Sequence, residues 1–153
     1  MNKWLSVIAV LLLAQSVAAW AQPATPTQFQ SLPADLSEPD RAAIRAVIED
    51  QMAAFQRDDG GAAFSHASPA IQAQFGTPEN FMRMVRQGYQ PVYRPRQVEF
   101  LDLVVARGEL VQRVFVVGPD GLDVIALYLM QRQLEGQWKI NGCVLVRPEG
   151  RRT

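Results

Sequence analysis

The sequence predicts an α+β domain in which N-terminal helices pack on a curved antiparallel four-stranded sheet. Two features of the chain lead to this fold class. Across residues 39–59 the apolar residues recur at spacings of three and four, which is typical of a helix that buries one side. After Pro95 the apolar residues follow a period of two in four segments, which glycine-containing turns separate at hairpin spacing. Because the helices and the strands occupy separate parts of the chain, we expect one antiparallel meander packed against the helices.

The N-terminus has the three-part pattern of a secretory signal peptide, which we place at residues 1–21. Lys3 supplies the single cation, an apolar run extends through Leu13, and small residues precede the expected cleavage after Ala21. The apolar run is shorter than the roughly 20 residues that span a bilayer. We therefore expect a periplasmic or secreted protein that has no membrane span once the signal peptide is removed.

The rest of the chain is expected to form one domain with short flanking segments. Residues 22–38 are rich in Pro, Thr and Gln and are typical of a flexible linker, residues 39–147 hold the α+β domain, and residues 148–153 form a basic tail. Cys143 is the single cysteine, so an internal disulfide is excluded and a small buried strand residue is expected. The 15 basic and 15 acidic residues balance, so the composition does not indicate nucleic-acid binding.

The predicted helices begin at capping residues. Ser37 and an acidic first turn open the helix of residues 39–59, and the pair Gly60 and Gly61 is expected to permit the chain reversal that ends it. In the two later helices a Ser or Thr followed by proline marks the start. The shorter helices are expected at residues 62–67, 69–76 and 78–88.

Residues 89–96 are predicted to form an extended connector between the helices and the sheet. Pro91 and Pro95 fix their own backbone geometry and restrict the residues before them, so we expect no helix in this segment. The four strands are then expected at residues 97–106, 110–117, 122–133 and 138–146.

The third predicted strand is apolar on both faces across residues 124–130. One face is expected to pack on the helices. The other face needs a different cover, because a broad exposed apolar patch is unusual on a soluble monomer. A second copy of the chain is the first candidate, so we expect a homodimer formed through the outer face of the sheet.

Aromatic, proline and small residues in the helices and the connector carry a resemblance to a known family. They are Gln51, Ala54, Phe55, Asp58, Asp59, Ala63, Phe64, Ala67, Ser68, Pro69, Phe75, Phe81, Met84, Val85, Tyr89, Pro91, Val92, Tyr93 and Arg94. On these residues the chain is similar, over residues 44–146, to the bacterial family catalogued as domain of unknown function 4864. This resemblance implies no activity, because that family has no assigned function.

The order of the elements carries a broader resemblance. Helices are followed by a connector and by a curled sheet that ends in Trp138, Lys139, Ile140, Asn141 and Gly142. This order resembles the cone-shaped nuclear transport factor two-like superfold. That superfold hosts isomerases, dehydratases, ligand binders and interaction domains, so the resemblance does not choose among functions.

A fold of this kind is expected to leave a pocket between the long helix and the sheet, which is the default place for a ligand. His66 is one candidate for proton transfer, because its ordinary pKa suits acid–base chemistry near neutral pH. Asp58 and Asp59 are the others, because paired carboxylates in a partly dry site can divide the roles of acid and base. The structural alternatives are packing or capping for His66, and capping of backbone N–H groups for the aspartates.

Tyr89, Tyr93 and Arg94 are the candidate ligand-binding residues. The guanidinium groups of Arg94 and Arg96 beside the two tyrosines could bind a carboxylate. In the alternative the tyrosines pack the connector against the fold and the arginines lie on the surface. One His and one Cys cannot complete a zinc shell, and no calcium-loop or phosphate-loop spacing occurs. We therefore expect no metal site and no cofactor.

Three functional hypotheses follow from these features. The first is an exported, non-catalytic domain that binds a small apolar or amphipathic molecule or a partner. The second is a lyase or isomerase that uses His66 or the pair Asp58 and Asp59 in the pocket. The third is a structural dimer module of the cell envelope.

Overall fold

The structure, a computed structural model of the chain, describes residues 29–30, 32–33 and 35–148. The predicted signal peptide at residues 1–21 lies outside the described residues, as does the predicted basic tail apart from Pro148. Within the described part of the chain, no helix has both the length and the apolar composition needed to cross a bilayer.

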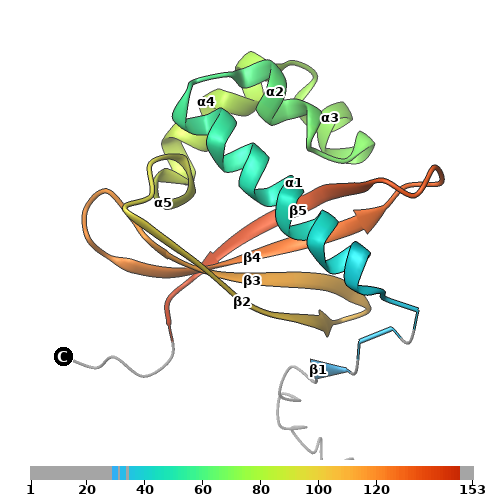
Figure 1. The fold of residues 1–153 in the computed structure, drawn as a ribbon. Coiled ribbons are helices and arrows are strands. Elements are labelled where there is room, and N and C mark those ends of the chain that lie inside the picture. The colour runs from blue at the N-terminus through green and yellow to red at the C-terminus, as the bar shows by residue number, and fades with distance from the viewer. Residues whose placement is uncertain (1–28, 31, 34, 149–153) are drawn as a thin grey trace, which may run out of the picture.

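Helices form one layer of the molecule and an antiparallel sheet forms the other (Figure 1). In chain order the elements are β1 (Phe29–Gln30), α1 (Glu38–Gln56), α2 (Gly60–Ser65), α3 (Pro69–Phe75), α4 (Pro78–Gly88), α5 (Gln90–Tyr93), β2 (Gln97–Ala106), β3 (Glu109–Val117), β4 (Asp123–Arg132) and β5 (Trp138–Val146). The strands pair in the order β1-β2-β3-β4-β5, and the sheet is open. This arrangement confirms the predicted α+β fold of helices followed by a four-stranded meander. The short β1, from the segment predicted as a linker, adds an edge beside β2.

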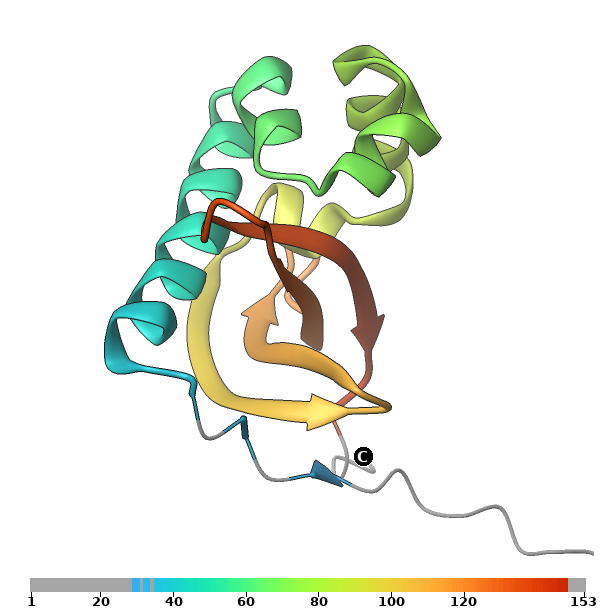
Figure 2. The same cartoon turned by 90° about the vertical axis from the view of Figure 1, so that its right-hand side faces the viewer.

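The long strands bend strongly, as the view in Figure 2 shows. The pairing of β2 with β3 shifts its register between Phe100 and Leu103, and the pairing of β4 with β5 shifts between Leu129 and Met130. An irregularity of this kind bends the strand and increases its local twist. The register shifts therefore give the sheet its curvature.

α1 lies across one face of the sheet and buries the apolar stripe that its sequence predicts (Figure 1). Ile44 and Ile48 have no exposed surface, and only 2% of Phe55 is exposed. Removal of this apolar surface from water is the main favourable contribution to folding. The residues of the sheet that belong to the same core include Val114, Val116, Ala126, Tyr128 and Met130.

The start of α1 is tied to the far end of the sheet through Asp40. Ser37 caps the helix, and its backbone N–H and its hydroxyl both donate to Asp40 Oδ2, at 3.1 and 2.7 Å. The indole Nε1 of Trp138 in β5 donates to Asp40 Oδ1 at 3.0 Å, and Arg132 lies 3.6 Å from the same oxygen. Hydrogen bonds from Ser37 and Trp138 lower the pKa of Asp40 from 3.8 to about 2.

An Asp40→Asn variant is expected to melt several degrees below wild type at pH 7. The pKa of Asp40 in the folded protein lies below its ordinary value, so the carboxylate stabilises the fold above about pH 4 and loses that effect as the pH falls toward 2. The difference in melting temperature should therefore shrink over that pH range. Thermal melts of both proteins at pH 7, 4 and 2.5 test this, and a difference that is constant across pH would contradict it.

The prediction of an extended connector over residues 89–96 is wrong for its first half, which forms the one-turn helix α5. The N–H groups of Val92 and Tyr93 donate to the carbonyl of Tyr89 at 3.1 and 3.0 Å. Pro91 lies in the first turn, where the missing N–H would have no partner within the helix in any case. Pro91 therefore starts this helix, whereas the prediction treats the proline as excluding a helix.

The prediction that the chain reverses at Gly60 and Gly61 is also wrong. α1 ends at Gln56, and the residue with a left-handed backbone is Asp58, with a φ of 55°. Aspartate tolerates this conformation better than most side chains. Gly60 and Gly61 instead begin α2, which Asp59 caps by accepting a hydrogen bond from the Ala62 N–H at 3.0 Å.

Candidate functional site

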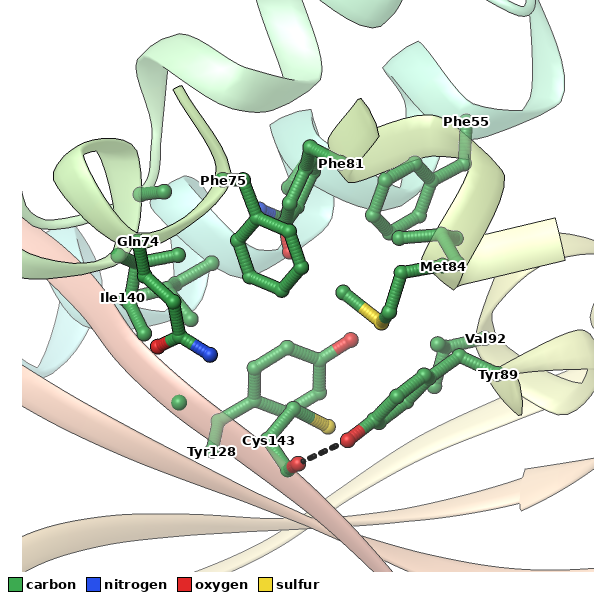
Figure 3. A pocket seen from close by; sticks show the side chains of 15 residues that line it. Phe55, Gln74, Phe75, Phe81, Met84, Tyr89, Val92, Tyr128, Ile140 and Cys143 are labelled. Atoms are coloured by element: carbon green, nitrogen blue, oxygen red, sulfur yellow. Dashed lines mark hydrogen bonds between the residues drawn. The ribbon is translucent and has the colours of Figure 1, made fainter. Parts of the chain in front are cut away.

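A cavity of about 330 Å³ lies between the helices and the sheet, within the range of about 300–1,000 Å³ that is usual for ligand pockets. Residues of α1, α3, α4 and α5 form its helical side, and residues of β4 and β5 form its floor (Figure 3). The residues that line it are Gln51, Phe55, Ala67, Ile71, Gln74, Phe75, Phe81, Met84, Val85, Tyr89, Val92, Tyr128, Ile140, Gly142 and Cys143.

Packed phenylalanine rings build the helical wall of the cavity. The ring centroid of Phe81 in α4 lies 6.2 Å from that of Phe55 in α1 and 5.6 Å from that of Phe75 in α3. It also lies 5.3 Å from the ring of Phe64 in α2, behind the wall. Such separations are typical of favourable aromatic pairs. The rings therefore hold four helices together around the cavity, and they leave its space open.

Tyr128 places a hydroxyl in the floor of this apolar cavity. The residue is 1% exposed, and its Oη makes no hydrogen bond. Figure 3 shows the hydroxyl pointing into the space between Phe75, Met84 and Tyr89. Burial raises the pKa of Tyr128 well above its ordinary value, so the group keeps its proton near neutral pH. A buried tyrosine hydroxyl normally has a partner, and leaving one without a partner costs about 1–3 kcal/mol.

Cys143 lies beside Tyr128 in the floor. Burial raises the pKa of the thiol to about 12, although the nearby Tyr128 hydroxyl opposes that shift. The pair does not reach hydrogen-bond geometry, and a thiol is a weak partner in any case. A thiol with this pKa holds almost no thiolate near neutral pH, so Cys143 is an unreactive part of the cavity floor.

The other polar groups of the cavity are engaged or lie at its mouth. The hydroxyl of Tyr89 donates to the Cys143 carbonyl at 3.0 Å, and the amide of the buried Gln51 donates to the Ala63 carbonyl at 3.1 Å. Gln74 lines the cavity and is itself exposed, so it marks the open side. None of the described residues that line the cavity is charged.

Tyr93 and Arg94 lie outside the cavity, in a cluster around Asp58. The Tyr93 hydroxyl donates to Asp58 Oδ1, and Arg94 donates to Asp58 Oδ2 at 2.8 Å and to the Phe55 carbonyl at 2.5 Å. Arg86 lies 3.6 Å from Asp58 Oδ1. The hydrogen bond from Tyr93, followed by the charge of Arg94, lowers the pKa of Asp58. The cluster ties α5 to the end of α1. The charge of Arg94 is already paired with the carboxylate of Asp58.

A second hollow, of about 440 Å³, lies on the surface beside this cluster. It is more polar than the first and is formed by the α1–α2 turn and α4. Its lining residues are Asp58, Gly60, Gly61, Pro78, Glu79, Met82, Arg83, Arg86 and Gln87.

The structure places His66 and Asp59 away from the cavity as well. His66 caps the end of α2, and its carbonyl accepts the N–H of Ile140 at 2.9 Å. Burial lowers the pKa of His66. The charge of Asp50 opposes that shift, whereas the charge of Lys139 adds to it. Asp59 is exposed and caps α2. The predicted proton-transfer candidates are therefore not brought together, and of the predicted ligand-binding residues the cavity contains Tyr89.

Sequence reasoning missed Tyr128. The available signal was a polar-tipped side chain inside the otherwise apolar run of residues 124–130. In such a run a tyrosine needs either an exposed position or a partner for its hydroxyl. The alternation could not show that a cavity lies over this residue.

The comparisons with known proteins give one result. A family model described as Domain of unknown function (DUF4864) matches residues 37–153. Neither the curated proteins nor the solved structures contain a match. The resemblance to the nuclear transport factor two-like superfold therefore stays a prediction.

Proposed function

Because the chain belongs to the family described as Domain of unknown function (DUF4864), a family without an assigned activity, we propose its function from the geometry of the cavity. The proposed function is that of an exported, non-catalytic domain that binds a small apolar or amphipathic molecule in the cavity. The observation that carries this proposal is the apolar cavity whose lining includes the buried Tyr128, a tyrosine with an unpartnered hydroxyl. Ligand sites are mostly apolar and hold a few placed polar groups that fix the orientation of the ligand.

A reaction in this cavity has little support from its lining. General acid–base catalysis requires a titratable group within hydrogen-bond reach of the substrate. His66, Asp58 and Asp59 do not line the cavity, and the two ionisable side chains best placed in its floor, Tyr128 and Cys143, both have raised pKa values. The lyase or isomerase hypothesis therefore ranks below ligand binding.

Native mass spectrometry of the protein purified from its host tests the proposal. We expect a mass above that of the bare chain, and the excess should disappear when the protein is denatured. The neutral dye N-phenylnaphthylamine, whose fluorescence rises in apolar surroundings, supplies the second measurement. It should bind the emptied protein at one molecule per chain. A bare mass under native conditions together with no rise in dye fluorescence would overturn the proposal.

The outer face of the sheet supports a second candidate function, that of a structural dimer module. The outward residues Leu127 and Val144 lie opposite one another in the β4–β5 pairing, and 50% of Val144 is exposed. Val146, opposite Ile125 on the same face, is 37% exposed. An apolar sheet face of this kind is typical of an interface. A second copy would cover it with the same surface.

A Val144→Lys variant tests this dimer. If the outer face is the interface, wild type should elute with the mass of two chains in size-exclusion chromatography with light scattering. The variant should elute with the mass of one chain, because a buried lysine without a partner is costly. Gln87→Lys adds the same charge on an exposed position of α4 and should stay dimeric. Wild type that elutes as a single chain at every concentration would contradict the dimer.

A further inference from the structure

Tyr128 and the uncharged lining together restrict what the cavity can hold. The floor offers one strong hydrogen-bond donor without a partner, and the described lining residues offer no charge to pair with an ion. Burial of an unpaired charge costs far more than burial of a neutral polar group that finds a partner. A neutral ligand therefore suits this lining better than a charged one.

Resting on the proposed function, we propose that the ligand is a neutral molecule with an apolar body and a hydrogen-bond acceptor, such as a ketone, ester or ether oxygen, that accepts from the Tyr128 hydroxyl. The apolar body would lie against Phe75, Phe81 and Met84. A free carboxylate is disfavoured, although the mouth beside Gln74 leaves room for a polar end that stays in water.

The other hydroxyl in the cavity does not compete for this role. The Tyr89 hydroxyl already donates to the Cys143 carbonyl at 3.0 Å. The Cys143 thiol also lines the cavity, but a thiol is a weak donor. Tyr128 keeps its proton near neutral pH, so it acts as a donor under ordinary conditions.

Three matched probes test the proposal in competition with N-phenylnaphthylamine. Benzophenone carries a carbonyl acceptor, diphenylmethane has a methylene in its place, and diphenylacetate carries a carboxylate. The readout is the affinity for benzophenone divided by the affinity for diphenylmethane. In Tyr128→Phe this ratio should fall about tenfold, which corresponds to about 1.4 kcal/mol, the size of one net hydrogen bond. Diphenylacetate should bind most weakly to wild type.

Tyr93→Phe is the matched control, because it removes a tyrosine hydroxyl that lies outside the cavity and bonds to Asp58. Its affinity ratio should equal that of wild type. Melting curves of the ligand-free proteins check folding, and Tyr128→Phe should melt no lower than wild type, since the lost hydroxyl has no partner.

The outcomes separate the two proposals. If the dye does not bind wild type and the native mass is that of the bare chain, the proposed ligand-binding function fails. If the dye binds and neither neutral probe displaces it, the inference of a neutral ligand with an acceptor is overturned. If both neutral probes bind and the ratio is the same in wild type and Tyr128→Phe, ligand binding stands and the role of Tyr128 is overturned. Tightest binding of diphenylacetate to wild type would also overturn the inference of a neutral ligand.

Discussion

Replacement of Ile48 by alanine is expected to lower the free energy of unfolding by about 3 kcal/mol. Ile48 lies in the middle of α1, has no exposed surface and belongs to the core that joins this helix to the sheet. The substitution removes buried methyl and methylene groups and leaves a cavity, and such changes cost about 2–5 kcal/mol. A loss of this size is a large fraction of the stability of a domain of this length.

Urea denaturation followed by circular dichroism measures the effect. Glu49→Ala is the control on the next position of the same helix, where the side chain is exposed and pairs with Arg45. The control should change the free energy of unfolding by no more than about 0.5 kcal/mol. If Ile48→Ala were as stable as the control, α1 would not be the helix around which the core is built.

Replacement of Ile71 by tryptophan is expected to reduce the affinity for N-phenylnaphthylamine about tenfold or more. Ile71 is half-buried on α3 and lines the cavity, so a bicyclic ring at this position would occupy the space that the dye needs. A tenfold loss corresponds to about 1.4 kcal/mol of binding free energy. Fluorescence titration of the dye gives the two dissociation constants.

Ala73→Trp is the matched control for this variant. Ala73 is exposed on the same helix and does not line the cavity, so the same ring placed there should leave the dye affinity within about twofold of wild type. Melting temperatures of both variants confirm that α3 is intact. Equal affinities of the two tryptophan variants would show that the dye binds somewhere other than the cavity.

The elements with a strong period could be predicted from the sequence. The stripe of α1 needs only the spacing of Ile44, Ile48 and Phe55, and the structure buries all three. The four long strands followed from the period of two and from the glycine-containing turns, and their pairing is the predicted meander.

The local predictions that are wrong concern residue types that are compatible with two backbone structures. Pro91 fits an extended segment, but it also fits the first turn of a helix, which is what α5 uses. Glycine is the usual residue for a left-handed backbone, yet the chain places Asp58 there, where Tyr93 and Arg94 hold its carboxylate. The contacts that hold Asp58 come from residues 35 and 36 positions further along the chain, and no local pattern reports them.

The cavity could be expected from the fold, but its chemistry could not. The candidates chosen from residue type are His66, Asp58 and Asp59. In the structure His66 and Asp59 cap α2, and Asp58 lies beside the end of α1. Tyr128 does not stand out in the sequence, because tyrosine is common in strands. Its significance arises from the cavity that it lines and from the partner that its hydroxyl lacks.

A crystal structure of the protein with bound N-phenylnaphthylamine tests the central claim most directly. We predict the dye between α3, α4 and β4, in contact with Phe81 and above the hydroxyl of Tyr128. A cavity closed by the side chains of Phe75 and Met84, with the dye on the outer face of the sheet, would contradict the account.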